Sequence, residues 1–378
     1  MKNPCSPIPI AISMGDPLGV GPEVILKALC SREIACRVIP IVVGLPSVMR
    51  KAAGMLRARV QIRTLSMDRL LAASETGVVY VLPPEKLRDP GDTLRSRGRK
   101  AAEGLYQTDS LLRAVEFLRT DGRQRFTKQA SDLILRGTVA AACVKEAADL
   151  CLRGHALALI TAPLSKASLQ AAGITYAGHT ELLRDFCGCK NTLMMFVRGR
   201  HKISLVTTHV PIGMIRKVLT RRRTERAIML THRGLGLLFG IPNPRLAVLS
   251  LNPHKGEDGL LGCEEKIVIE PAIELVCQKG VRAFGPFAAD SFFSRGEWNK
   301  FDAVVAMYHD QGLIAAKLLG GERVTNLTLG LPFVRTSPGH GVAEDIAWKG
   351  VADPQGMISA ILLAAKLTGT VRLPLKWN

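Results

Sequence analysis

Short apolar runs, many of them β-branched, alternate with longer amphipathic stretches along most of the chain. Such runs are typical of buried strands in a parallel sheet, and the stretches between them have helical periodicity. We predict strands at 8–14, 38–44, 77–82, 156–160, 191–197 and 202–208, and in the runs that lead to His254 and His309. We predict helices at 23–30, 46–56, 100–152 (broken near 120–128), 220–239, 262–279 and 356–367. The alternation indicates an α/β fold with a largely parallel sheet.

Three histidines lie near the ends of such runs: His209, His254 and His309. Open α/β sheets place their ligands at the carboxyl ends of the strands. Three imidazoles there could hold one divalent metal and leave coordination positions for a substrate. Any one of them alone is better explained as an ordinary histidine ending a strand, but three in matching positions favour a metal site.

Length and composition narrow the class of protein. A chain of 378 residues suits one large or two medium domains. No apolar stretch approaches the ~20 residues that cross a bilayer, and prolines near the N-terminus interrupt any signal-peptide core. Nine cysteines without a framework are typical of reduced thiols. We expect a cytoplasmic protein with no membrane partner.

The formal net charge is +19, which suits either nucleic-acid binding or attraction of small anions. Basic residues cluster at 198–202 and 221–223, but aromatic residues are only 5% and do not interleave with them. This argues against a surface that stacks single-stranded bases. We expect no nucleic-acid partner, although the charge alone does not decide the question.

A glycine-rich turn, Gly15-Asp-Pro-Leu-Gly-Val-Gly-Pro-Glu23, follows the first predicted strand. It matches neither the GxGxxG dinucleotide fingerprint nor the GxxxxGK[ST] phosphate loop, so the chain has no Rossmann or Walker signature. Pro22 and Glu23 are favourable at a helix start. The glycines would let the backbone approach a ligand or a neighbouring domain.

With six other stretches, this turn resembles the 4-hydroxythreonine-4-phosphate dehydrogenases of pyridoxal phosphate synthesis. The other stretches are Thr161-Ala-Pro-Leu-Ser-Lys166, Gly178-His-Thr-Glu181, Thr207-Thr-His-Val-Pro211, Leu251-Asn-Pro-His254, Met307-Tyr-His-Asp-Gln-Gly312 and Thr328-Leu-Gly-Leu-Pro-Phe-Val-Arg-Thr-Ser337. Together they are highly specific, and none would be so alone.

The resemblance implies a two-domain fold like that of isocitrate and isopropylmalate dehydrogenases. One α/β domain would comprise 1–165 and 325–378, with the NAD-binding loop. The other, 166–324, would carry the metal-binding histidines and the dimer interface. The family's site is shared across a homodimer, so the partner chain can supply one ligand histidine.

The resemblance also implies roles for individual residues. His209, His254 and His309 would bind the metal (Zn, Mg, Co or Mn), and with Lys317 they form the predicted catalytic group. The predicted substrate-binding residues are His179, Thr180, Lys317, Asn326 and Arg335. The segment 340–353 resembles the cofactor loop of decarboxylating dehydrogenases, so His340, Gly341 and Asp353 are predicted to bind NAD or NADP.

The implied reaction is the oxidation of 4-phosphooxy-L-threonine to a 3-keto acid, which loses CO2 to give 3-amino-2-oxopropyl phosphate. The chain departs from the family pattern at Lys255, in Gly256-Glu-Asp-Gly259 and at Gly339, and the region 112–132 is longer than usual. Because some of these changes adjoin a metal ligand and the cofactor loop, other substrates stay open. The alternatives are a phospho-threonate, a phospho-erythronate or a cis-dihydrodiol carboxylate.

Overall fold

The computed structural model describes residues 7–67, 78–85, 129–176, 178–369, 371 and 373–377. The chain divides into two compact units, residues 1–186 with 340–365 and residues 187–339 with 366–378. No helix in the described part is long and apolar enough to cross a lipid bilayer.

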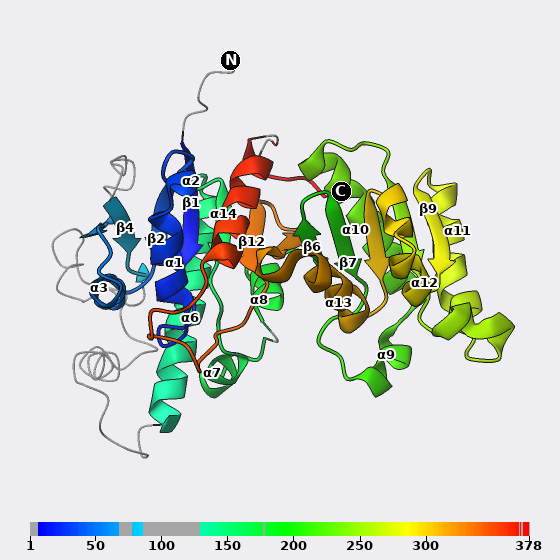
Figure 1. The fold of residues 1–378 in the computed structure, drawn as a ribbon, viewed down its shortest axis with the longest axis horizontal. Helices are drawn as coiled ribbons and strands as arrows, with labels where there is room; N and C mark the ends of the chain where they lie inside the picture. Colours follow the sequence, from blue (N-terminus) through cyan, green and yellow to red (C-terminus); the bar gives the residue numbers. More distant parts are fainter. Residues whose placement is uncertain are drawn as a thin grey trace. The chain divides into compact units, whose positions relative to one another are not determined.

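The first unit has five described strands in the order β3-β4-β2-β1-β5, and every pair among them is parallel (Figure 1). The strands are β1 (Ile8–Ser13), β2 (Val38–Val43), β3 (Gln61–Thr64), β4 (Val78–Leu82) and β5 (Ala158–Thr161). Buried aliphatic side chains fill β1, β4 and β5, as expected for strands covered on both faces.

The long helix α6 is central to the packing of the first unit, because it contacts β1, β2, β5, α7 and α8. The helices are α1 (Gly21–Leu29), α2 (Arg32–Ala35), α3 (Pro46–Met55), α6 (Gln129–Leu152), α7 (Lys166–Ala171), α8 (His179–Phe186) and α14 (Gln355–Thr368). Gly137 lies where α6 meets α7, and a Cβ there would be 1.9 Å from the carbonyl oxygen of Ser168.

The second unit has its strands in the order β12-β11-β6-β7-β10-β8-β9. They are β6 (Leu193–Arg198), β7 (His201–Leu205), β8 (Arg245–Leu249), β9 (Arg282–Phe287), β10 (Ala303–Ala306), β11 (Thr325–Leu329) and β12 (Val334–Pro338). The pairs from β7 to β9 are parallel, whereas β12, β11, β6 and β7 pair antiparallel.

Helices cover both faces of this sheet. Alternate residues of β6, β7, β8 and β10 form one core with Phe292 of α12 and Ala316 of α13. On the opposite face, Thr231 of α10 donates a 2.8 Å hydrogen bond to Ser204 of β7. The helical segments are α9 (Ile212–Val218), α10 (Arg221–Phe239), η3 (Pro253–Gly259), η4 (Glu265–Ile269), α11 (Glu270–Gln278), α12 (Ala289–Ser294), η5 (Glu297–Lys300), α13 (His309–Gly320) and η6 (Gly321–Arg323).

The predicted fold class is confirmed: the chain is α/β and its strands are mostly parallel. The strands before the three histidines end earlier than predicted, at Leu205, Leu249 and Ala306. Four strands were not predicted. Strand β3 is short and partly exposed, and β9 contains a Gly-Pro pair. Strands β11 and β12 lie between 325 and 338, where the sequence was assigned motif and substrate-binding residues but no strand. The predicted helix from 100 to 128, its break and most of the long 112–132 region lie outside the described residues.

The unit boundaries lie further along the chain than the predicted division into 1–165 with 325–378 and 166–324. Helices α7 and α8 pack against α6, which keeps them in the first unit. Strand β11 pairs with β6 and β12, which keeps the two strands after residue 324 in the second unit. These contacts join segments far apart in sequence, so local patterns did not reveal them.

Candidate functional site

The parallel pairing of β7 with β10 brings two of the three predicted metal ligands together. Beyond the strands, Thr207 continues the pairing, because its backbone N–H and its hydroxyl both donate to the carbonyl of Met307, at 3.1 and 2.7 Å. Two residues further along each segment stand His209 and His309, whose ring centroids are 5.7 Å apart. The sheet register therefore sets this histidine pair.

A cavity of about 140 Å³ opens beside these two histidines. Its lining residues are Thr207, His209, Val210, Ile212, Ile215, Tyr308, His309 and Asp310. Nδ1 of His309 lies 2.6 Å from Oδ1 of Asp310. This contact orients the ring and leaves its other nitrogen, Nε2, as the atom that could bind a metal. Asp310 had no role in the sequence prediction, although it directly follows His309.

Gln311 connects the segments that follow two neighbouring strands, β10 and β8. Its Oε1 accepts a 2.7 Å hydrogen bond from the backbone N–H of Met307, and its Nε2 donates a 2.7 Å bond to the carbonyl of Ser250. Met307 follows β10 and Ser250 follows β8, so one side chain ties these exits together. Nothing in the local sequence marks Gln311 for this role, because its partner near residue 250 is visible only in the folded chain.

The buried carboxylate of Glu265 holds the segment before His254. It accepts hydrogen bonds from the backbone N–H groups of Leu251 and Asn252, at 2.8 and 2.7 Å. The Asn252 amide also donates to Glu264. Burial raises the pKa of Glu264, but this hydrogen bond and the charge of Arg216 outweigh burial and lower it.

His254 itself lies on an exposed turn with an unusual backbone. Five consecutive residues from His254 to Asp258 have positive φ, and only one of them is glycine. For residues with a Cβ this left-handed region is unfavourable. Among the described residues, no three His, Cys, Asp or Glu side chains form a group that could hold a metal. The structure thus brings His209 and His309 together within one chain and does not add His254 to them.

Two predicted substrate-binding residues share one face of the β11–β12 pair. Arg335 is opposite Thr328, and its Nη1 donates a 2.9 Å hydrogen bond to the Thr328 hydroxyl. Asn326 is two residues from Thr328 and so points to the same face. Arg335 is only 1% exposed, and Oδ1 of Asn326 is buried without a hydrogen-bond partner among the described residues. Lys317 is exposed near the end of α13.

The other predicted ligand-binding residues belong to the first unit. His179 and Thr180 begin α8, and both are half-buried. Nδ1 of His340 lies 3.0 Å from the carbonyl oxygen of Gly341, which makes Nδ1 the protonated nitrogen and Nε2 an acceptor. Asp353 accepts a 2.9 Å hydrogen bond from the backbone N–H of Gln355 at the start of α14.

The loop that carries His340 contains two buried polar atoms, Nε2 of His340 and Nε1 of Trp348, with no hydrogen-bond partner in the described part of the chain. Buried polar groups usually have partners, so these two atoms are candidates for hydrogen bonds to a ligand. Trp348 was not singled out in the sequence, though it lies within the predicted cofactor segment.

The same loop is attached to the segment around α1. Glu23 is 2% exposed and accepts a 2.9 Å hydrogen bond from the backbone N–H of Ala352. Lys27 donates to the carbonyls of Gly350 and Ala352, at 2.8 and 2.7 Å. The glycine-rich turn predicted to approach a ligand or another domain therefore approaches other segments of its own unit, and Gly15 (φ +74°) has no room for a Cβ against Pro163.

Comparison with known proteins finds relatives that match almost the whole chain. The family model for the pyridoxal phosphate biosynthetic protein PdxA matches residues 36–364. A 4-hydroxythreonine-4-phosphate dehydrogenase of Desulforapulum autotrophicum is 37% identical over 369 residues, covering 96% of this chain and 97% of the relative. A D-threonate 4-phosphate dehydrogenase of Pectobacterium atrosepticum is 36% identical, covering 95% and 98%. The crystal structure of a 4-hydroxythreonine-4-phosphate dehydrogenase from Klebsiella pneumoniae has a TM-score of 0.75 and 34% identity, covering 96% of this chain and 100% of that one.

Proposed function

The chain belongs to the family of the pyridoxal phosphate biosynthetic protein PdxA and is an oxidoreductase, and from this premise we propose that it oxidises 4-phosphooxy-L-threonine with NAD or NADP. In this reaction the secondary hydroxyl of the substrate loses its proton and the carbon that bears it loses a hydride, which NAD or NADP would accept when bound. The 3-keto acid then releases its carboxylate as CO2, and its α-carbon takes up a proton to give 3-amino-2-oxopropyl phosphate. The observation that carries this proposal is the pair His209 and His309 beside a cavity in a member of this family.

The donor set fits a divalent metal in part. His209 and His309 are adjacent, and a catalytic site of this kind usually has three protein ligands and an open position. His254 would supply the third ligand if the site is shared between two subunits. A metal bound there would supply a Lewis acid that lowers the pKa of the substrate hydroxyl. Asp310 would hold the His309 ring in its ligating orientation through the 2.6 Å contact to Nδ1.

The remaining charged and polar residues suit an anionic substrate. Arg335 presents a planar guanidinium that matches a phosphate or carboxylate, and its burial strengthens such a contact. Asn326 offers the buried carbonyl oxygen without a partner, which suits an ammonium or hydroxyl donor. His179, Thr180 and Lys317 complete the predicted substrate-binding group, and an exposed lysine such as Lys317 can reach a phosphate as a mobile point charge.

The dinucleotide is assigned to the loop at 340–353. The acceptor Nε2 of His340 and the donor Nε1 of Trp348 support this assignment, because both lack partners among the described residues. Bound NAD or NADP would supply the hydride acceptor, while the protein would hold the adenosine end at His340 and Gly341. Asp353 would act through the start of α14, where it accepts the Gln355 N–H.

The protein is proposed to act as a homodimer in the cytoplasm. Large apolar side chains are exposed on several elements of the second unit, and Leu260 and Leu318 are 81% and 83% exposed. Apolar exposure on this scale is typical of surfaces that bind another protein. A second copy of the chain would cover such residues and could bring His254 to the histidine pair.

The decisive experiment measures NAD or NADP reduction by near-ultraviolet absorbance with 4-phosphooxy-L-threonine, with and without a divalent metal. We expect rapid reduction that a chelator abolishes and added metal restores. Reduction that persists undiminished in the metal-free protein would refute the metal assignment. No reduction with either coenzyme would refute the dehydrogenase assignment for this substrate.

D-threonate 4-phosphate is the second candidate substrate, because a relative bearing that name is almost as similar as the first. It carries a hydroxyl where 4-phosphooxy-L-threonine carries an amino group, so the two compounds test the same chemistry in parallel assays. A higher kcat/KM for D-threonate 4-phosphate than for 4-phosphooxy-L-threonine would support the same hydride chemistry but assign the protein to a different pathway.

A further inference from the structure

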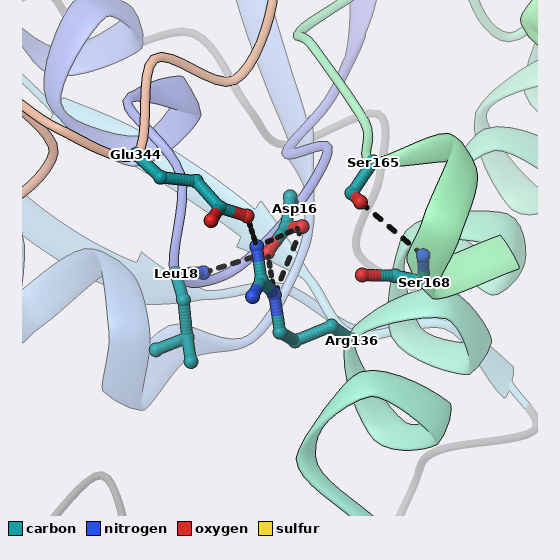
Figure 2. Close-up of polar contacts among 6 residues, drawn as sticks. All are labelled: Asp16, Leu18, Arg136, Ser165, Ser168 and Glu344. Carbon is teal, nitrogen blue, oxygen red and sulfur yellow. Dashed lines mark hydrogen bonds and ion pairs between the residues drawn. The ribbon is translucent and has the colours of Figure 1, made fainter. Parts of the chain in front are cut away.

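A charged cluster in the first unit begins with a buried carboxylate (Figure 2). Asp16, in the loop after β1, is 0% exposed, and its Oδ1 accepts a 3.0 Å hydrogen bond from the backbone N–H of Leu18. Arg136 of α6 faces it with two nitrogens: Nε lies 2.9 Å from Oδ1, and Nη2 lies 2.8 Å from Oδ2. This two-pronged contact fixes the plane of the guanidinium.

The same guanidinium also reaches the loop between β12 and α14. Nη2 of Arg136 donates a hydrogen bond to Oε1 of Glu344, so one side chain connects three segments that are distant in sequence (Figure 2). Burial lowers the pKa of Arg136, but hydrogen bonds and charges from Asp16 and Glu344 outweigh it and raise the pKa. The two carboxylates differ, because Asp16 is buried whereas the Glu344 side chain is 56% exposed. Asp16 therefore anchors Arg136, and Arg136 holds Glu344.

Glu344 lies in a strained part of the loop. Ala343, immediately before it, has φ 44°, and Trp348 has φ 61°. Residues with a Cβ avoid this left-handed region unless the surrounding structure enforces it. The Arg136–Glu344 contact is adjacent to Ala343, so it is placed to enforce this conformation.

Backbone contacts hold the loop on either side of this part. The N–H of Val20 donates a 3.0 Å hydrogen bond to the carbonyl of Val342, and Glu23 accepts from the N–H of Ala352. Between these attachments lies Trp348, whose buried N–H has no hydrogen-bond partner among the described residues. The strained middle of the loop therefore contains the Trp348 N–H, which could donate a hydrogen bond to a ligand.

We propose that Arg136 is a positioning residue, which holds the 340–353 loop through Glu344 in the conformation that receives the adenosine end of the dinucleotide. This inference rests on the proposed function, because it takes the loop as the cofactor site. A loop that is only partly in its binding conformation binds with an affinity reduced by that fraction. The Glu344 side of this ion pair is 56% exposed, so removing the Glu344 charge should affect cofactor binding more than the fold.

The test compares the full-length wild type with Glu344→Gln and Arg136→Lys. Gln keeps the size of Glu344 without its charge, and Lys keeps the charge of Arg136 without its fork. Glu33→Gln, at an exposed glutamate on α2, is the matched control for charge removal. We expect Glu344→Gln to raise the KM for the dinucleotide about tenfold, with kcat at saturating cofactor within about twofold. Arg136→Lys should behave similarly, and the control should match the wild type.

Hydrogen–deuterium exchange of peptides covering 340–350, measured without cofactor, gives an independent readout. Faster exchange there in both loop variants, but not in Glu33→Gln, is the expected result. Unchanged exchange together with an unchanged KM would overturn the inference. Wild-type protein that neither binds nor reduces a dinucleotide would refute the proposed function and the cofactor role of Arg136 with it, and the exchange data would show separately whether Arg136 holds the loop.

Discussion

At the scale of single residues, the pair His209 and His309 depends on strand pairing as well as on the local conformation of each residue. His209 has φ 50°, a left-handed backbone that Asn, Asp and His tolerate better than most residues. His309 begins α13 and contacts Asp310. Each position follows from its own loop, but their 5.7 Å separation follows from the pairing of β7 with β10.

The residue-scale prediction concerns His209→Asn, which removes the imidazole but suits the left-handed backbone. Loss of a residue that only orients a metal ligand already costs about 10–100-fold in a metal site, so we expect loss of a ligand to lower turnover at least about a hundredfold. Bound metal, measured by mass spectrometry of the dialysed protein, should fall in parallel, and the thermal midpoint should stay near that of the wild type. His155→Ala, at a histidine with no assigned role, is the control. A His209→Asn protein with full activity would exclude this metal site.

At the scale of elements, close approach of helices organises the first unit. Helix α6 spans 24 residues and contacts β1, β5, α7 and α8. Its contact with α7 is possible only because Gly137 has no side chain, and the neighbouring Arg136 forms the contact to Asp16. Two neighbouring residues of α6 therefore have separate roles: Gly137 allows the close approach of α7, and Arg136 binds Asp16.

The element-scale prediction is that Gly137→Ala destabilises the protein. The new Cβ would lie 1.9 Å from the Ser168 carbonyl oxygen, so backbone must move, at a cost of about 1–3 kcal/mol or more. Gly54→Ala in α3 is the matched control, because nothing lies within 4 Å of its Cβ. Alanine there should stabilise the helix by up to about 1 kcal/mol. Urea unfolding of both variants checks this, and equal effects would show that α6 and α7 are not closely packed in solution.

At the scale of the whole molecule, exposed apolar side chains of the second unit support the proposed homodimer. The most exposed large apolar side chains of the second unit lie on α9, η4 and α13 and directly after η3: Ile212, Ile267, Ile314, Leu318 and Leu260. A shared site would explain why the described part of one chain groups two histidines rather than three.

The whole-molecule prediction is that Leu318→Asp weakens the proposed homodimer. Burying an unpaired carboxylate in an apolar interface is costly, so the mass measured by light scattering should shift towards the monomer on dilution. Ile134→Asp is the control, since Ile134 is an exposed apolar residue of the first unit. An unchanged mass for Leu318→Asp would exclude α13 from the interface, and a monomeric wild type would exclude the shared site.

Much of the architecture was predictable because it depends on local patterns. Strands β1, β2, β4, β6 and β7 and the helices α3, α10 and α14 lie close to their predicted positions. The helix predicted at 262–279 is divided into the π-helical turn η4 and the helix α11, which has Pro271 in its first turn. Edge strands such as β3 were missed because a partly exposed strand has no strong apolar pattern.

By itself, the sequence determined the α/β class, most of the elements and, through its motifs, the family, because periodicity and motif spacing are properties of neighbouring residues. It also marked His209 and His309 as residues near strand ends. Only the tertiary structure decided that these two histidines meet, that Gln311 ties two strand exits together, and that Arg136 reaches both Asp16 and Glu344. These contacts join segments distant in the chain, and the order and register of the strands, which no local pattern encodes, bring them together.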